Sequence, residues 1–334
     1  MKRFWSFTTA VLLLSLLVTA CGGAATTAAP TSAPAPTEKP KLKIAMLTSG
    51  PINDEGWNQT AYEGLQSLKA KGYTVANTEQ VQQADQASNI ESYVNQGFDV
   101  IVGHGFEYGD SLLAAAKKHP NVHFIQIGGI ATNDNLASYV FKPGEGGYVA
   151  GTLAAHLSKS GKWGFVGAVE IPTIQADEQT YEMAIKNIKS GASVVAAYTG
   201  SWVDIPKAKE AALAQLSSGV DVILANGDNA NVGAIQAVKE KGGVVIGWTR
   251  DQSHLAPDNV AMSILQRVDV LLQQAVASVE DGTFKGGNYT VGFKEGISDI
   301  SEFGTMVPDE AKAAVKQAVE DVKAGKVKLP EIGG

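Results

Sequence analysis

The sequence predicts an α/β protein with two lobes, each a parallel sheet covered by helices on both faces. From residue 41 onward, short continuous apolar runs alternate with amphipathic stretches. Apolar runs without polar alternation are typical of parallel strands that are buried on both faces, and the stretches between them are typical of crossover helices. The alternation runs through two successive halves of roughly 100 residues each, a usual domain size, which favours two doubly wound domains over one long sheet.

The predicted elements follow this pattern in order. In the first half we expect strands over 42–47, 73–75, 99–102 and 122–127 and helices over 57–71, 84–96 and 112–118. After a crossover near Tyr139, we expect helices over 147–158, 177–188, 206–216 and 232–241 and strands over 164–169, 194–198, 221–224 and 244–246. The last elements, a strand over 260–265, a helix over 268–279 and a strand over 289–293, are expected to return to the first lobe and cross back.

Repeated crossing predicts a hinge of several chain segments. Lobe 1 is then 41–140 with a return segment of about 260–288, and lobe 2 is 141–258 with a C-terminal segment of about 289–330. A cleft that closes about such a hinge is a common switching geometry.

The N-terminal residues predict export and anchoring. Lys2 and Arg3 precede an apolar run over 11–17, well short of the ~20 residues that a spanning helix needs. Small residues then lead to Cys21, the single cysteine of the chain. A cysteine directly after the cleavage site matches a bacterial lipobox, so we expect a signal peptide over 1–21 and lipid on Cys21. The stretch 22–40 is rich in Ala, Thr and Pro, and it predicts a disordered tether to the outer face of the cell membrane.

Charge and composition exclude several partners and activities. Removing the signal peptide takes the formal charge from −7 to −9, which argues against nucleic acid as a partner. The five histidines show no metal-ligand spacing, and no P-loop, GxSxG or cysteine nucleophile is present. We therefore expect a monomeric binding protein without cofactor or metal, and not an enzyme.

Aromatic side chains gather in the loops that follow predicted strands. Ligands of open parallel sheets bind beyond the carboxyl ends of the strands. Five aromatic residues fall in these loops, in a chain that is only 7% aromatic: Trp57, Phe106, Tyr108, Trp202 and Trp248. A planar ligand would stack on such rings, and we expect Trp57 from one lobe and Trp202 from the other to enclose it.

Amide and carboxylate side chains share the same loops. They are Asn53, Asp54, Asp204, Asn226, Asp228 and Asp251. We expect them to bind the edge of the ligand by hydrogen bonds. For Asp54 and Asp228, capping of the helix that follows is an alternative role.

Seven segments, in order over 41–325, resemble the BMP family, the basic membrane protein or purine nucleoside receptor-like substrate-binding lipoproteins of ABC importers. They are 50–57 (Gly-Pro-Ile-Asn-Asp-Glu-Gly-Trp), 61–64, 144–154 (GEGGYVAGTLA), 200–204 (Gly-Ser-Trp-Val-Asp), 251–253, 281–283 and 303–308. The resemblance implies a type I periplasmic-binding fold, an ABC permease as partner and a purine nucleoside or nucleobase as ligand. By the same resemblance, Asn53, Asp54 and Trp57 match the first ligand loop, Trp202 and Asp204 match a Ser-Trp-x-Asp pattern, and Asn226 and Asp228 match a polar loop of the second lobe.

The chain departs from nucleoside-binding relatives at three places. Those relatives carry an acidic residue near Gly128 and Gly129, an Asp in place of Thr249 and a Lys near Gln266, groups suited to ribose hydroxyls. Their absence favours a free purine-like base, and Arg250 is a further candidate contact for an acidic or carbonyl-rich ligand. A pentose or other sugar and an extracytoplasmic sensor without transport remain alternatives.

Overall fold

The computed structural model describes residues 41–330. The expected signal peptide, the tether and Cys21 lie outside the described residues. Among residues 41–330, every helix is too short or too polar to span a bilayer.

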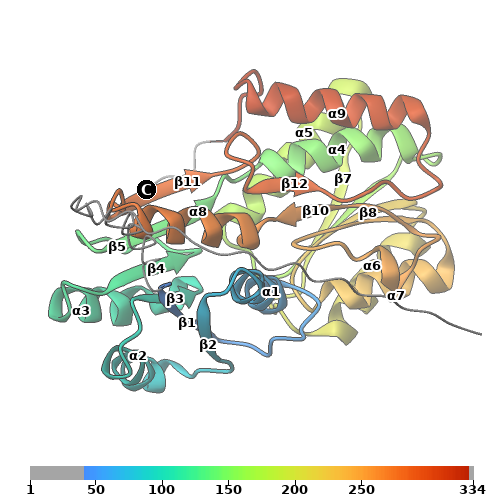
Figure 1. Cartoon of the computed structure of the whole chain (residues 1–334). Coiled ribbons are helices and arrows are strands. Elements are labelled where there is room, and N and C mark those ends of the chain that lie inside the picture. The colour runs from blue at the N-terminus through green and yellow to red at the C-terminus, as the bar shows by residue number, and fades with distance from the viewer. Residues whose placement is uncertain (1–40, 331–334) are drawn as a thin grey trace, which may run out of the picture. The chain divides into compact units, whose positions relative to one another are not determined.

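Lobe 1 contains a parallel sheet of six strands in the order β11-β5-β4-β3-β1-β2 (Figure 1). In chain order these are β1 (Lys43–Thr48), β2 (Thr74–Thr78), β3 (Val100–His104), β4 (His123–Ile127), β5 (Leu136–Phe141) and β11 (Gly287–Val291). One face packs on α1 (Trp57–Ala70) and α8 (Val268–Glu280), and the other packs on α2 (Gln86–Asn95) and α3 (Gly109–Lys118). The strands β1 and β3 are buried almost throughout, as expected for a sheet that is covered on both faces.

Lobe 2 repeats the plan with the strand order β12-β10-β9-β8-β6-β7. Its strands are β6 (Trp163–Gly167), β7 (Val194–Tyr198), β8 (Val222–Asn226), β9 (Val244–Gly247), β10 (Val260–Gln266) and β12 (Ser298–Ile300). One face packs on α4 (Glu145–Leu157), α5 (Pro172–Ile188) and α9 (Asp309–Lys323), and the other on α6 (Ile205–Ser217) and α7 (Asn231–Lys241). Short 3-10 turns at Gln83–Asp85, Phe106–Tyr108 and Ser253–Leu255 complete the described elements.

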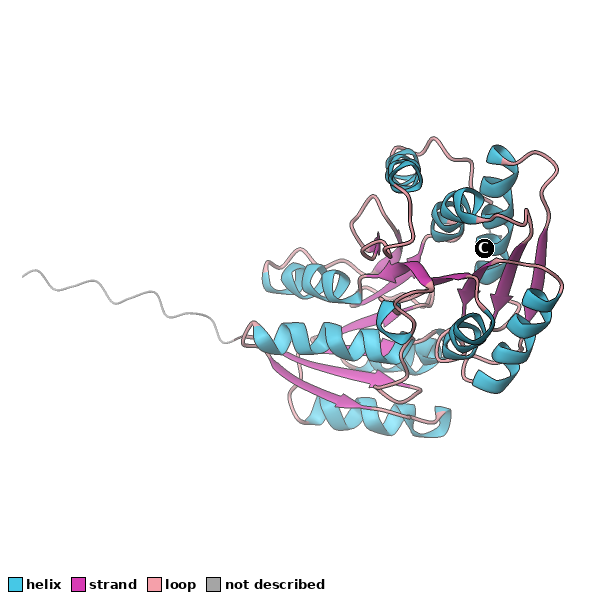
Figure 2. Ribbon diagram, turned by 90° about the vertical axis from the view of Figure 1, so that its right-hand side faces the viewer, coloured by secondary structure: helices cyan, strands magenta, loops and turns pink. Residues whose placement is uncertain are grey.

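The predicted class, two doubly wound α/β lobes, is confirmed, with one mixed feature. The short β12 pairs antiparallel with β10, and all other strand pairs are parallel. The sequence pattern missed β12, which has only three residues, and it missed β5, where only a crossover was expected. Figure 2 shows the two sheets, each with helices beside it.

The expected lobe boundaries in the last third of the chain are wrong. The strand β10 pairs with β9 and belongs to lobe 2, whereas β11 pairs with β5 and belongs to lobe 1. The chain therefore crosses between the lobes three times: after β5, between β10 and α8, and between β11 and β12. An apolar run predicts a strand, but it carries no information on which sheet accepts that strand.

Glycines let α4 and α5 pack closely in lobe 2. A Cβ atom at Gly151 would lie 2.3 Å from the carbonyl oxygen of Tyr181, and one at Gly147 would lie 2.1 Å from that of Asp177. The obstructing atoms belong to the backbone of α5, so the clash could be relieved only by moving a helix.

We therefore predict that Gly151→Ala lowers the free energy of unfolding by about 1–3 kcal/mol through overpacking. Gly109→Ala in α3 is the control, because its Cβ would come no closer than 3.3 Å to any neighbouring atom, the Gln126 side-chain nitrogen, and alanine favours the helix. Urea unfolding of both variants checks this, and equal midpoints for Gly151→Ala and wild type would contradict it.

Candidate functional site

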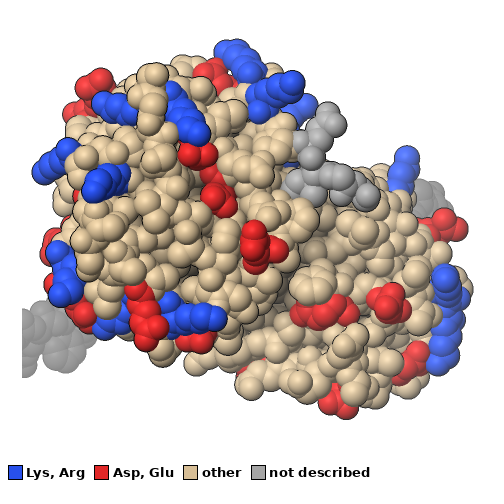
Figure 3. Space-filling view, turned by 180° about the vertical axis from the view of Figure 1, so that it is seen from behind, with Lys and Arg blue, Asp and Glu red and all other residues tan. Residues whose placement is uncertain are grey.

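A cavity of about 450 Å³ lies between the two lobes. It is lined by segments that follow β1, β3 and β4 in lobe 1 and β6, β7, β8 and β9 in lobe 2, and by the segments that cross between the lobes. On the molecular surface a groove separates the lobes, with acidic side chains along it and Lys and Arg mostly at the periphery (Figure 3). The cavity is thus at the carboxyl ends of both sheets, where ligands of such folds bind.

Aromatic rings enter this cavity from both sides. Trp57 and Phe106 come from lobe 1, and Trp202 and Trp248 come from lobe 2. Trp248 is 7% exposed and packs against the backbone of α4, since a Cβ atom at Gly146 would lie 2.4 Å from its ring. Phe106 is 70% exposed. The expectation that Trp57 and Trp202 reach one gap from opposite lobes agrees with this geometry.

Trp57 is held from behind by a buried histidine. Its ring stacks on His104 with centroids 3.9 Å apart and an interplanar angle of 23°, and it makes a T-shaped contact with the Phe141 ring, with centroids 6.0 Å apart. His104 Nε2 lies 3.0 Å from the Trp57 carbonyl oxygen, and burial lowers the pKa of His104 to about 3. The imidazole is therefore neutral and donates its Nε2–H to that carbonyl. The Trp57 face away from His104 remains available to a ligand.

Gly128 explains why Trp57 can lie where it does. Its φ of +90° is in the region that favours glycine, and a Cβ atom there would lie 3.2 Å from Cζ2 of Trp57. The indole thus occupies space beside the position where nucleoside-binding relatives are expected to carry an acidic side chain.

Asp54 caps α1 and also lines the cavity. Its Oδ1 accepts hydrogen bonds from the N–H groups of Gly56 and Gln59, each at 3.0 Å. Its Oδ2 accepts from the N–H of Asn58 at 3.0 Å and from Asn58 Nδ2 at 2.7 Å. Both oxygens are committed to the protein, so the capping alternative holds for this residue.

Asp228 is a carboxyl group of the cavity whose oxygens are not committed to capping. Only its backbone carbonyl bonds to the start of α7, and its side chain has no hydrogen-bond partner among the described residues. Burial, and then the charges of Asp54 and Glu107 from the opposite lobe, raise the pKa of Asp228 to about 8. Such an acid is placed to bind a donor group of a ligand.

Asp177 and Asn226 form a second polar pair at the floor of the cavity. Asn226 Nδ2 donates to Asp177 Oδ2 at 3.2 Å, and the Gly144 N–H donates to Oδ1 at 3.0 Å. Burial raises the pKa of Asp177 to about 7, although these hydrogen bonds act in the opposite direction. Asp177 therefore joins α5 to the start of α4 and leaves Asn226 fixed in orientation.

The cavity brings together seven of the side chains proposed from the sequence: Asp54, Trp57, Phe106, Trp202, Asn226, Asp228 and Trp248. The other four lie elsewhere. Asn53 and Asp251 are exposed outside it, Tyr108 is fully buried in the lobe 1 core, and Asp204 caps α6 by accepting from the Lys207 N–H at 2.9 Å. The prediction that these four residues line the cavity is wrong, because the side chains of a strand-end loop point both toward the cleft and away from it.

Arg250 does not line the cavity. Its guanidinium pairs with Glu55 and with Glu63 of lobe 1. The expectation that Arg250 contacts an acidic or carbonyl-rich ligand is therefore not supported by its position.

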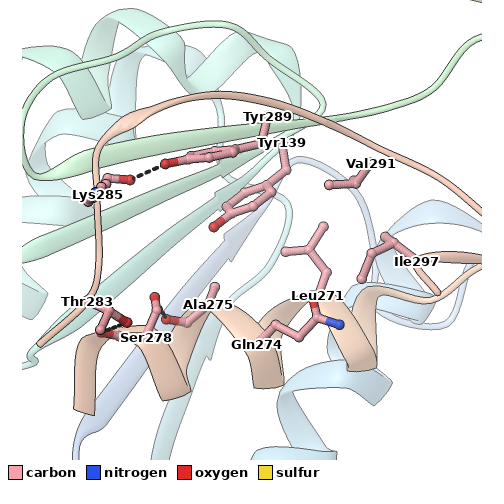
Figure 4. A pocket seen from close by; sticks show the side chains of 10 residues that line it. All are labelled: Tyr139, Leu271, Gln274, Ala275, Ser278, Thr283, Lys285, Tyr289, Val291 and Ile297. Atoms are coloured by element: carbon pink, nitrogen blue, oxygen red, sulfur yellow. Dashed lines mark hydrogen bonds between the residues drawn. The ribbon is translucent and has the colours of Figure 1, made fainter. Parts of the chain in front are cut away.

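A second, smaller cavity of about 210 Å³ lies on lobe 1 between α8 and β11 (Figure 4). The rings of Tyr139 and Tyr289 stack along its wall, 5.2 Å apart, and the Tyr289 hydroxyl donates to the Lys285 carbonyl oxygen at 2.9 Å. It shares no lining residue with the cavity between the lobes. Within residues 41–330 no cluster of His, Cys, Asp and Glu could hold a metal ion.

A family-wide profile described as ABC transporter substrate-binding protein, PnrA-like, matches residues 41–332. The chain belongs to the Bmp family. The resemblance noted in the sequence is thereby confirmed. The general role that it implied is confirmed as well, because Bmp proteins are substrate-binding components of ABC transporters.

Curated Bmp relatives and solved structures agree with this assignment. A purine-binding protein of Brucella abortus is 29% identical over 291 residues, covering 86% of this chain and 82% of that relative. The ABC transporter nucleoside-binding protein BmpA of Lactococcus lactis is 30% identical over 319 residues, covering 87% and 90%. A solved ABC transporter solute-binding protein from Conexibacter woesei superposes with a TM-score of 0.77 at 26% identity, covering 86% of this chain and 98% of that one.

Sequence reasoning missed several residues that line the cleft of this Bmp protein. They include Asn58, Glu107, Phe141, Lys142, Ile174 and Asp177. Phe141 and Lys142 lie at the first crossover between the lobes. The glycine-rich stretch 144–147 that follows them could have indicated that the chain passes the cleft here. Asp177 lies inside a helix, and no local pattern marks it as facing a cleft.

Proposed function

We propose that this Bmp-family protein binds a purine-type nucleobase or nucleoside in the cleft between its lobes and delivers it to an ABC permease. The proposal includes anchoring by lipid on Cys21 at the extracytoplasmic face of the cell membrane. The observation that carries the ligand class is that Trp57 and Trp202 line one cavity from opposite lobes, with Trp248 beside them. A flat heterocycle stacks on such rings, at about 1–3 kcal/mol per ring.

The polar lining supports a ligand with hydrogen-bond donors and without phosphate. Asp228 and Asn226 supply an acceptor and an amide at the lobe 2 side. Lys142 is the one cation among the lining residues, and it pairs with Glu145 at 3.2 Å. A phosphorylated ligand would meet carboxylates without a free cation, so a base or nucleoside fits better than a nucleotide. The names of the Brucella and Lactococcus relatives point to the same class.

A free base fits the lining better than a nucleoside. The three positions at which the family resemblance implies ribose-binding groups in nucleoside-binding relatives are occupied here by Gly128, Thr249 and Gln266, and all three line this cavity without a charge. We therefore propose guanine-like or adenine-like bases as the first candidates.

Thermal unfolding with separate ligands tests the proposal. Adenine, guanine, xanthine, adenosine, guanosine, ribose and guanosine monophosphate are added in parallel to the protein. A ligand at 100 times its Kd adds about 2.7 kcal/mol of stability, so we expect a clear rise in Tm with a purine base and none with the monophosphate. A rise with ribose alone would replace the purine proposal with a sugar-binding one.

The anchor is tested separately. Cells that express the full chain are labelled with a fatty acid analogue, and the Cys21→Ala variant is the control. Label on wild type and none on the variant is the expected result, and equal labelling would rule out lipid on Cys21.

A further inference from the structure

Arg250 connects the two lobes through two acidic side chains. It lies in the loop after β9 of lobe 2, and its two terminal nitrogens pair with Glu55, just before α1, and with Glu63, within α1. The Glu63 contact measures 3.0 Å. His254, from the same lobe 2 loop, brings Nε2 within 3.3 Å of the Glu55 carboxylate. Glu55 therefore faces two basic side chains of the opposite lobe.

Neutral hydrogen bonds span the same boundary. Gln252 Nε2 donates to the Glu55 carbonyl oxygen at 3.1 Å, and Asn229 Nδ2 donates to the Asp54 carbonyl oxygen at 2.7 Å. Gly56 packs directly on lobe 2, since a Cβ atom there would lie 2.9 Å from Cα of Asp228. These contacts all involve the loop before α1, so separation of the lobes breaks them together.

Unusual backbone conformations occur on both sides of this junction. Glu55 has a φ of +55° and Thr249, directly before Arg250, has a φ of +76°. Only one other non-glycine residue within 41–330, Gln80, has a positive φ. Such conformations are unfavourable for these residue types, and they persist where the surroundings hold them, often at functional sites. Here they aim the two charged partners at each other across the lobe boundary.

We infer that Arg250, Glu55 and Glu63 form an interlobe clasp that holds the lobes closed and sets how fast the cleft opens. The Arg250 side chain is only 19% exposed, so solvent screens its pairing less than that of an ordinary surface pair. Inside the cleft, the carboxyl group of Asp228 lies close to those of Asp54 and Glu107 of lobe 1, and whenever Asp228 is ionised their like charge opposes closure. The clasp at the rim counteracts this repulsion whatever the ligand is, so the inference does not depend on the purine proposal.

The test compares two glutamates with similar partners. Glu55 pairs with an Arg and a His across the lobes, whereas Glu91 pairs with Lys118 at 2.9 Å and His119 at 3.0 Å within lobe 1. Small-angle X-ray scattering is recorded on the ligand-free full chain of wild type, Glu55→Gln, Arg250→Ala and Glu91→Gln. We expect a larger radius of gyration for Glu55→Gln and Arg250→Ala, and no change for Glu91→Gln. The N-terminal residues are the same in all four proteins and do not affect the comparison.

A second measurement covers ligand release. The ligand is the base that raises Tm most, and its dissociation rate is followed by tryptophan fluorescence. We expect this rate to rise about tenfold in Arg250→Ala. The rise should be smaller in Arg250→Lys, because lysine keeps the charge but cannot pair with two carboxylates through separate nitrogens of one planar group. Glu63→Gln, whose side chain is 52% exposed and tolerant of change, gives a clasp variant that is expected to fold.

Scattering curves of Glu55→Gln and Arg250→Ala that superpose on wild type would overturn the clasp. If no tested ligand binds wild type, the purine proposal fails while the scattering result still decides about the clasp.

Discussion

Replacing Trp57 with alanine is expected to weaken binding of the proposed purine ligand about 10- to 100-fold. One stacked ring contributes about 1–3 kcal/mol, and each 1.4 kcal/mol is a factor of ten in Kd. Trp57 is fixed by the stacked His104 and by close contact with Gly128, so its ring is already in place before a ligand binds. Isothermal titration with the ligand found by thermal unfolding measures the effect.

Trp163→Phe is the matched control for this experiment. Trp163 is 3% exposed in the lobe 2 core, and its indole N–H donates to the Ala154 carbonyl oxygen at 2.9 Å. Its replacement should lower stability and leave Kd unchanged. Trp57→Phe keeps an aromatic face and should lose less affinity than Trp57→Ala. An unchanged Kd in Trp57→Ala would remove the stacking role.

The stability of the ligand-free protein is expected to fall as pH rises from about 6.5 to 8. The pKa of Asp177 is raised to about 7 and that of Asp228 to about 8, from ordinary values of 3.8. In this window the folded state holds protons that the unfolded chain has lost, so raising the pH favours unfolding. His104 acts in the opposite direction, because burial lowers its pKa to about 3. The stability that comes from keeping His104 neutral is lost only as the pH falls below about 6.5, so it does not change the trend between pH 6.5 and 8.

Asp228→Asn should remove much of this pH dependence. Its amide carries no charge to bury or to repel Asp54 and Glu107, so the variant should be more stable than wild type at pH 9 by at least about 1.4 kcal/mol, the equivalent of one pKa unit. Urea midpoints at pH 6 and 9 measure this. Asp251→Asn, which changes an exposed carboxylate bonded only to the Ser253 N–H, should behave as wild type. Parallel pH profiles for wild type and Asp228→Asn would show that Asp228 does not carry the effect.

Much of the cleft could be predicted because its determinants are local. Asn226 ends a strand and Trp57 and Trp202 follow strands, and the apolar runs of these strands are readable in the sequence. The carboxyl ends of parallel strands meet at one edge of a sheet. The position of a residue in a strand-end loop did not predict whether its side chain points into the cleft. Tyr108 turns into the core of lobe 1, and Asp204 turns back to cap a helix, because a short turn can present either side of the chain.

The sequence by itself determined the α/β class, the two-lobed plan and the aromatic character of the strand-end loops, since hydrophobic periodicity and turn residues act within a few positions of the chain. Only the tertiary structure decided which sheet takes β10 and β11, that Asp177 faces the cleft, and that Arg250 meets Glu55 and Glu63. Those outcomes depend on contacts between residues that are 15 positions apart for Val260 and Val245 and 195 positions apart for Arg250 and Glu55. No local pattern specifies the partner in such a contact.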